Sequence, residues 1–456
     1  MQELPATSSL PSEQKHLPQE LIDYIIGYLH GDRDTLLSCS RVSRSWLPSA
    51  QAHLFHSVTI GPGQELQQFI SFITVSPYLC RHIVRISVDG RSPANPLSPT
   101  PIIPYELSEM PQLQELNPVQ IQTFISLFPC LQAIELKYVH LVPTTEAAIS
   151  RQKIGETRAK FRLERFLVGH CSFEHPTDLL EFVQFFQGIN HLYIAQNFSK
   201  SPQPRRPGQC PEPMPTISHL SFEYLRATTR LHRASNLASR SILQALNTKP
   251  LQSLQFTHCP PWAFRYASLA IEAVDPGLPH LSLDLKGLSE RFSPCQSAER
   301  GPPERIKRLQ QLQSLSLDMQ MDQDSETGRF RSTGVWSFLS EILYVLHPEP
   351  FAKLRRFRLK LFLPDMCPSS DFWDVFAYEA DYTLRSLDRF VSSRESMEEL
   401  EFQRYSTRNS TYLWISAPGT IDRRTRATDT PLISPTNSLQ PISRSTTPIP
   451  IVPRRV

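Results

Sequence analysis

Three cations alternate with apolar residues in the C-terminal third of this sequence: Arg356, Arg358 and Lys360. Alternate residues of a β-strand point to the same face, so a strand here would present all three cations together. Guanidinium groups match carboxylate and phosphate groups in shape and charge. The pattern therefore predicts a binding site for acidic or phosphorylated protein segments. The alternative is structural, because Glu399 and Glu401 on the next strand could form ion pairs with these cations.

Motifs for catalysis are absent from the sequence. No phosphate-binding glycine loop, no Gly-x-Ser-x-Gly nucleophile motif and no His-Glu-x-x-His zinc motif occurs. The eight cysteines are widely separated and form no Cys-x-x-Cys pair. Asp32 and Asp34 could hold a metal ion, but their place before a helical pattern suits helix capping, and His280 is interpreted as a surface or structurally satisfied residue. We therefore expect no enzyme, no metal site and no cofactor.

The N-terminal region carries an apolar pattern typical of two short amphipathic helices. Pro18 suits a first helical turn, and Asp32 or Asp34 can cap the second helix. Neither helix could bury its apolar stripe alone, so the pair needs a partner surface. The apolar residues recur at three- and four-residue intervals: Leu21, Ile22, Ile25 and Leu29, then Leu36, Cys39, Val42 and Trp46.

The same segment resembles an F-box. The run from Leu17 to Leu21 is similar to the Leu-Pro-x-Glu-Leu motif of that family, and the run from Val42 to Trp46 is similar to its Val-Cys-Arg-x-Trp motif, with Ser43 in place of cysteine. The resemblance implies docking onto a Skp-family adaptor and, through it, onto a cullin. The alternative is a helix pair that caps the downstream domain. The resemblance implies these adaptor-binding residues: Leu17, Pro18, Leu21, Ile22, Ile25, Leu29, Leu36, Val42 and Trp46.

Beyond residue 50 the chain repeats a pattern of one apolar, two variable, one apolar, one variable and one apolar residue, at irregular spacing. Each motif ends in the alternation of a short strand, and helix-like segments follow at 120–128, 177–187, 238–247 and 336–346. This order predicts an α/β fold with parallel strands inside and helices outside. The motifs begin at Phe55, Ile83, Leu131, Leu163, Ile189, Ile217, Leu251, Leu278, Leu312, Leu354 and Met397.

The repeated pattern is similar to leucine-rich repeats. Cys171, Asn197 and Cys259 occupy the position where that family favours asparagine or cysteine, and for the two cysteines we expect a buried structural role. The resemblance implies an irregular horseshoe over residues 51–416, after an F-box at 14–50. The variable residues of each motif would line its concave face, where His191 and Tyr193 offer a second candidate anchor for a protein substrate.

Composition limits the remaining possibilities. Serine, threonine, proline and arginine dominate residues 417–456, which predicts a disordered tail, and the proline-rich stretches 92–104 and 201–215 are expected to be exposed loops. The net charge is +3 over 456 residues, and without the tail the chain is nearly neutral, which argues against nucleic acid as the main partner. We find no secretory signal and no apolar run that could enter a membrane, and expect a cytoplasmic or nuclear location.

Together these features predict a non-catalytic substrate-recognition subunit of a Skp-cullin-F-box ubiquitin ligase. The F-box would bind the Skp-family adaptor, and the repeats would bind a protein substrate that the sequence does not identify. The alternative is a leucine-rich-repeat interaction scaffold with no ligase role.

Overall fold

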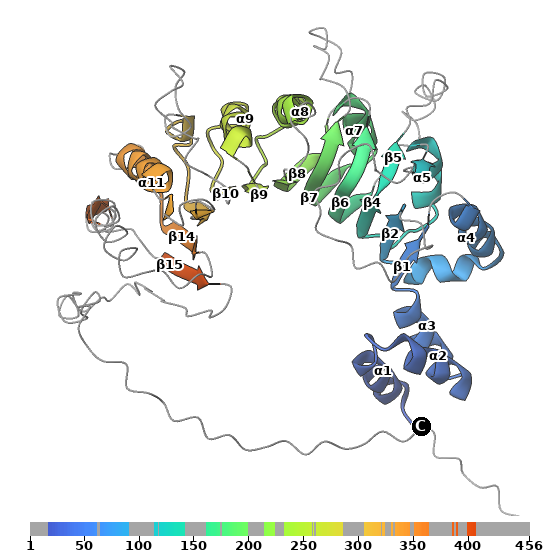
Figure 1. Ribbon diagram of the computed structural model, residues 1–456. Coiled ribbons are helices and arrows are strands. Elements are labelled where there is room, and N and C mark those ends of the chain that lie inside the picture. The colour runs from blue at the N-terminus through green and yellow to red at the C-terminus, as the bar shows by residue number, and fades with distance from the viewer. Residues whose placement is uncertain are drawn as a thin grey trace, which may run out of the picture. The chain divides into compact units, whose positions relative to one another are not determined.

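Helices and strands both occur along the chain, and the strands form one large parallel sheet that is not closed, so the fold class is α/β as predicted (Figure 1). The computed structural model describes residues 17–61, 64–90, 114–116, 118–141, 161–173, 176–198, 214–223, 232–257, 259, 261–285, 305–320, 322–323, 330–331, 333–346, 351–363, 385–386, 389–390 and 399–406.

The N-terminal helices are three rather than two: α1 (Gln19–Tyr28), α2 (Arg33–Val42) and α3 (Leu47–Leu54). Asp32 caps α2 as predicted, because its carboxylate accepts a hydrogen bond of 3.0 Å from the backbone N–H of Thr35. Ser43 has extended backbone angles, which end α2. Trp46 therefore does not continue the second helix, as the sequence pattern suggested, but stands at the N-cap of α3.

A small core holds these helices together. Ile22 and Ile26 of α1 and Leu36 of α2 are buried there, with Trp46 packed against the edge. The chain then passes from α3 into the first strand, and the His56 carbonyl accepts hydrogen bonds from the backbone N–H groups of Val84 and Arg85. The helical group is thus joined directly to the start of the sheet.

The last two apolar residues of each predicted motif lie on one strand of the sheet. Neighbouring strands are parallel, and their order follows the sequence. This path consists of β1 (Ser57–Ile60), β2 (Arg85–Asp89), β4 (Ala133–Lys137), β6 (Arg162–Phe173), β7 (Gly188–Phe198), β8 (Thr216–Glu223), β9 (Ser253–Thr257), β10 (His280–Leu285), β11 (Ser314–Gln320), β14 (Arg356–Leu363) and β15 (Glu399–Ser406).

Shorter strands lie beside this path. β3 (Gln114–Leu116) pairs with β5 (Val139–Leu141), which in turn pairs with β6. β12 (Asp322–Gln323) and β13 (Phe330–Arg331) form a separate antiparallel pair.

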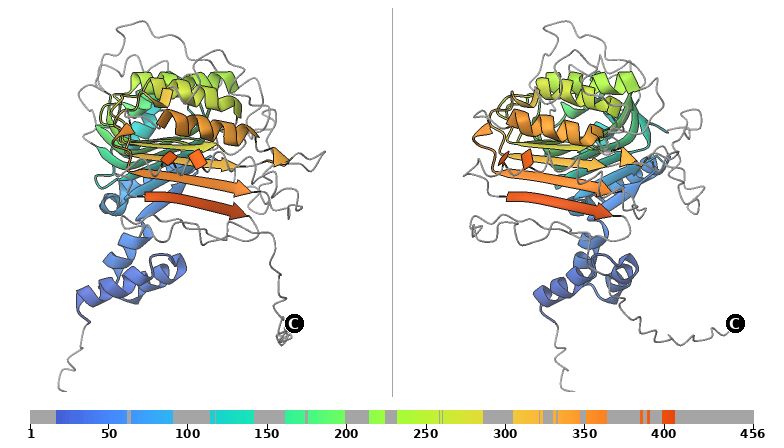
Figure 2. Two further views of the ribbon diagram at one scale, coloured as in Figure 1. Left: turned by 90° about the vertical axis from the view of Figure 1, so that its left-hand side faces the viewer. Right: turned by 60° about the vertical axis from the view of Figure 1, so that its left-hand side comes forward.

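The helices that follow the strands cover one face of the sheet (Figures 1 and 2). Those over 118–125, 176–183, 232–245 and 333–346 confirm the four predicted helical segments, with ends that differ by a few residues. The covering elements are α4 (Gln64–Val75), η1 (Pro77–His82), α5 (Pro118–Ile125), α7 (Pro176–Val183), α8 (His232–Ala245), α9 (Pro261–Glu272) and α11 (Thr333–Leu346).

The main core lies between the helices and the sheet. Phe166 of β6, for example, is fully buried against Phe182 of α7. The motif residues align across strands, so that Leu281, Leu315 and Phe357 occupy matching positions on β10, β11 and β14. Each motif therefore contributes to one continuous apolar layer, which it shares with its neighbours.

Three residues of the early strands have special backbone geometry: Gly90 follows β2, Tyr138 follows β4, and His170 lies in β6 where its register with β7 shifts. Gly90 donates a backbone hydrogen bond of 2.8 Å to the Lys137 carbonyl, and a Cβ at Gly90 would lie only 2.0 Å from the carbonyl oxygen of Tyr138. Tyr138 and His170 adopt left-handed backbone angles, and their rings stack at 4.8 Å. Only glycine fits at position 90, because any side chain there would clash with the Tyr138 carbonyl.

The cysteines predicted to be structural are buried. The Cys171 thiol donates to the Leu136 carbonyl at 3.3 Å, and burial raises its pKa to about 12. Burial also raises the pKa of Cys259, whose backbone N–H donates to the Asp284 carbonyl. Both thiols therefore stay protonated and act as small packing groups.

Some predictions lie outside the described residues. These are the disordered tail 417–456, the proline-rich stretch 92–104 and nearly all of 201–215. In the described part of the chain, no helix has the length and apolar character needed to cross a membrane.

Candidate functional site

Helix α1 has two apolar stripes, and only one of them is covered. Its inner stripe contains Ile22 and Ile26, which pack into the helical core. Leu21 lies on the other stripe and is 49% exposed, whereas the adjacent Ile22 is 2% exposed. The outer stripe repeats at helical spacing and begins with Leu17, which precedes the helix: Leu17, Leu21, Tyr24, Ile25 and Tyr28.

The outer stripe ends in a pair of tyrosines. The rings of Tyr24 and Tyr28 contact edge to face, with centroids 4.9 Å apart. Their hydroxyl groups form a hydrogen bond, which raises the pKa of Tyr28. Both side chains are exposed, and Leu37 and Val42 of α2 are exposed as well. Aromatic side chains that offer apolar area and a polar tip are typical of protein interfaces.

Hydrogen bonds fix α1 against α3. The Asp23 carboxylate accepts hydrogen bonds from the Ser49 hydroxyl and, at 2.7 Å, from the Gln19 amide. These bonds lower the pKa of Asp23. Gln19 also donates to Ser49 at 3.2 Å. The helix is thus held by its inner stripe and by this polar contact, which leaves the outer stripe facing solvent.

The residues predicted to bind an adaptor divide between the surface and the core. Ile22 and Leu36 are buried between the helices, so they support the surface from beneath instead of lying on it. Leu29 and Trp46 are partly buried against the same core. The exposed ones are Leu17, Pro18, Leu21, Ile25 and Val42.

The division has a physical cause. The sequence pattern groups Leu21, Ile22, Ile25 and Leu29 in one stripe, but α3 supplies Ala50 to the core and thereby selects one side of α1. Tyr24, Tyr28 and Leu37 are exposed beside these residues but were not among those predicted. The tyrosines could have been found from the three-residue spacing of Tyr24 to Leu21 and the four-residue spacing of Tyr28 to Tyr24.

The second candidate surface is the face of the sheet opposite the helices. The predicted register of its last two strands is confirmed: Arg356 pairs with Glu399 and Arg358 pairs with Glu401. On the other side of β14, Lys360 lies opposite Asp318 of β11. Acidic residues therefore stand next to all three cations. This arrangement suits cross-strand ion pairs, and an acidic ligand would have to compete with them.

Tyr193 and His191, the second predicted anchor, lie on β7. The Tyr193 hydroxyl donates to the Glu223 carboxylate, and burial together with this carboxylate raises its pKa. His191 is exposed, and its ring stacks on His219 with centroids 4.3 Å apart. The strands β8 to β11 separate β7 from β14, so the structure does not bring Tyr193 and Arg358 together; their strands are about 24 Å apart.

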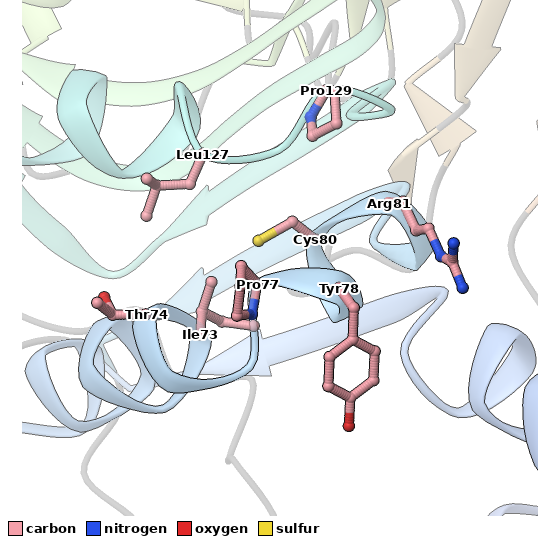
Figure 3. Close-up of a pocket in the computed structure, with 8 residues that line it drawn as sticks. All are labelled: Ile73, Thr74, Pro77, Tyr78, Cys80, Arg81, Leu127 and Pro129. Atoms are coloured by element: carbon pink, nitrogen blue, oxygen red, sulfur yellow. The ribbon is translucent and has the colours of Figure 1, made fainter.

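A pocket of about 440 Å³ opens between η1 and the end of α5 (Figure 3). The side chains of Ile73 and Cys80 lie on one side of it, and those of Leu127 and Pro129 lie on the other. Burial raises the pKa of Cys80, which keeps its thiol protonated. The lining is mainly apolar and offers contact area more than reactive groups: Ile73, Thr74, Pro77, Tyr78, Cys80, Arg81, Leu127 and Pro129.

Within the described residues, no group of three or more His, Cys, Asp or Glu side chains is arranged to hold a metal ion. Comparisons with protein-family models and with curated proteins find no match to this chain.

Proposed function

We propose that this protein is the substrate-recognition subunit of a Skp-cullin-F-box ubiquitin ligase. Residues 14–50 would act as an F-box that docks a Skp-family adaptor. Residues 51–416 would act as an irregular leucine-rich-repeat domain that binds a target protein on the open face of its sheet. The observation that carries the proposal is the exposed outer stripe of α1.

An exposed apolar stripe on a helix that already has a covered stripe is unusual for a surface that meets only water. Leu17 and Leu21 belong both to this stripe and to the segment that resembles the Leu-Pro-x-Glu-Leu motif. The residues of the motif are therefore the residues available for docking. Burial of such aliphatic and aromatic anchors supplies most of the binding free energy at protein interfaces.

The proposed role needs no reactive groups on this chain. An adaptor of a ligase acts by holding its target close to the partner that carries the reactive thioester, and so raises the effective concentration of the reacting groups. Two separate docking surfaces on one chain, α1 and the open face of the sheet, are sufficient for this.

The test is adaptor binding by the full-length chain with Leu21→Asp and Ile25→Asp combined. Both side chains are exposed, so the substitutions leave the helical core intact. Anchors of this kind contribute about 2 kcal/mol each, which predicts a loss of affinity of at least about 100-fold. Val75→Asp is the matched control, because Val75 is apolar and 84% exposed but lies on α4.

Binding would be measured with a purified Skp-family adaptor, with circular dichroism to confirm folding. Pro18→Ala should have a much smaller effect, because the proline only pre-sets the start of α1. Unchanged adaptor binding by the double variant would remove the main support for the F-box assignment. A folded parent chain that binds no adaptor at all would favour the alternative, a repeat scaffold with no ligase role.

A further inference from the structure

Three histidines lie in one line across the open face of the sheet. His191 of β7 pairs in register with His219 of β8. His219 pairs with Ser253 of β9, which pairs with His280 of β10. We call His191, His219 and His280 the histidine row.

An arginine occupies the same line beyond each end of the row. Arg165 of β6 pairs with His191. At the other end, Ser314 of β11 pairs with His280 and with Arg356 of β14. The line therefore carries imidazole and guanidinium groups, with serine hydroxyls between them, and it crosses the strands at right angles to the chain direction.

The surroundings of His219 and His280 make protonation of these two histidines costly. The imidazoles of His191 and His219 stack nearly parallel at 4.3 Å, so two positive charges there would repel each other. Burial lowers the pKa of His219, and its neighbours His191 and His280 lower it further. Burial and the charge of Arg356 lower the pKa of His280. A negative charge placed along the row would offset these costs.

Other charged groups lie on the open face of the sheet near the row. Glu164 of β6 is 3.7 Å from the His191 ring and favours the charged form of His219. Its carboxylate also accepts a hydrogen bond from Asn190. In β9, no residue of Ser253–Thr257 is charged. Glu399 of β15 pairs in register with Arg356 and so continues the line beyond that arginine. The other charged or titratable positions of this face on β4 and on β6 to β15 are Glu135, Lys137, Arg165, Tyr193, Glu223, Asp284, Asp318, Arg356, Arg358, Lys360 and Glu401.

We propose that the histidine row binds an extended acidic segment of the target protein, laid across the strands, and that this binding takes up protons. The inference rests on the proposed function only in treating the ligand as the target protein. Binding should therefore strengthen as the pH falls, because a neutral imidazole becomes a cation that pairs with a carboxylate.

The dimensions fit a peptide. Strands are spaced about 4.8 Å apart, so the line from Arg165 to Arg356 is about 29 Å long, which an extended chain covers in about nine residues. The next positions along the strands are uncharged at Ser221, Gln255 and Ser282 and can form hydrogen bonds with a peptide.

The charges around the histidine row disfavour nucleic acid as the ligand. Acidic positions follow two residues further on, at Glu223 of β8 and Asp318 of β11. On β7 to β11 the cationic and imidazole positions of this face thus form a narrow line, and Arg358 and Lys360 of β14 stand opposite Glu401 and Asp318. A phosphate backbone with its bases needs a broader basic surface. A single line of carboxylates matches the row better.

The experiment uses the full-length chain and a labelled peptide of about ten residues that alternates glutamate and serine. A peptide of the same length that alternates lysine and serine, and a single-stranded RNA of the same length, serve as controls. Affinity for the acidic peptide should rise by at least about tenfold between about pH 8 and pH 6, since each proton taken up changes affinity by about tenfold per pH unit. Calorimetry in two buffers of different ionisation enthalpy should show proton uptake.

Two kinds of variant locate the effect. The triple variant His191→Gln, His219→Gln and His280→Gln should reduce the pH dependence to less than about twofold. Glu164→Gln should strengthen peptide binding, because it removes a carboxylate that competes for His191; Glu164 is exposed, so this variant tests the row even if the first one does not fold.

The results of these experiments distinguish the histidine-row inference from the proposed ligase function. Peptide binding that is absent near pH 6, or that does not depend on pH, would overturn the inference, as would tighter binding of RNA than of the acidic peptide. Histidine variants should keep adaptor binding, and the Leu21→Asp and Ile25→Asp variant should keep peptide binding. Loss of adaptor binding alone would thus count against the ligase role and leave the histidine row standing.

Discussion

Truncation of Leu315 should destabilise the sheet on both sides of β11. Leu315 is fully buried, and its register neighbours Leu281 and Phe357 are buried as well. Leu315→Ala removes three buried carbon groups, each worth about 0.8 kcal/mol of transfer free energy. The cavity that remains raises the expected loss in the free energy of unfolding to about 3 to 4 kcal/mol. That is a large share of the roughly 5 to 15 kcal/mol that stabilises a typical domain.

Two measurements on the full-length chain test this prediction. Urea denaturation gives the loss of stability, and hydrogen exchange read by mass spectrometry gives its location. Protection should fall together in β10, β11 and β14, because each strand buries its apolar side chains only against its neighbours. Ser316→Ala is the matched control on the opposite face of β11 and should change stability by less than about 0.5 kcal/mol. A loss below about 1 kcal/mol, or a loss of protection confined to β11, would refute the reasoning.

The remaining predictions concern charge pairs and thiols. Arg358→Glu should lower stability modestly, since it places like charges opposite each other, and Glu401→Arg in the same chain should restore the urea midpoint. If the charge-swapped pair also restores full target binding, the role of Arg358 is structural; if it restores stability but not binding, Arg358 contacts the target. Cys171, whose pKa is raised to about 12, should resist iodoacetamide at about pH 8 in the folded chain, whereas the exposed Cys130 should react. Equal reaction rates at the two thiols would contradict the buried packing of Cys171.

The repeated apolar motif predicted the sheet well because its information is local. Within each motif, residues such as Leu254 and Phe256 alternate with polar ones, and both are fully buried in β9. The same alternation recurs in every strand of the path, so the strands and their parallel order follow from the sequence. The ends of elements were less predictable. Ser43 ends α2 through its backbone conformation, which no apolar pattern reveals, and Trp46 was therefore placed on the wrong element.

The exposed apolar stripe on α1, our candidate docking surface, could be predicted only in part. Leu21 and Ile22 are adjacent, similar in size and equally apolar, yet one is exposed and the other is buried. What separates them is the packing of Ala50 from α3, which the sequence analysis did not anticipate. A local pattern can show that a helix is apolar on one side. It cannot show which of two adjacent stripes another helix will cover.

The histidine row could not be predicted from a local sequence pattern, for a different reason. In the sequence His191, His219 and His280 stand far apart, and each looks like an isolated surface residue. Parallel register places them at matching positions, and the contact between two of the rings follows from the spacing of adjacent strands. Once the motifs are aligned by their buried residues, the row can be read as one column of that alignment.

The line of the histidine row also changes how the two predicted substrate anchors relate to each other. These anchors are the cations of β14 and the pair His191 and Tyr193. His191 and Arg356 belong to one line across the sheet, although the strands that carry them are not neighbours. Arg358 lies two residues further along β14 and belongs to a different line, opposite Glu401. Because the buried face fixes the register, substitutions on the open face alter one position in one line and leave the fold in place. In the proposed binding mode, rows that cross the strands would set recognition, and Arg356 groups with the histidines of its line.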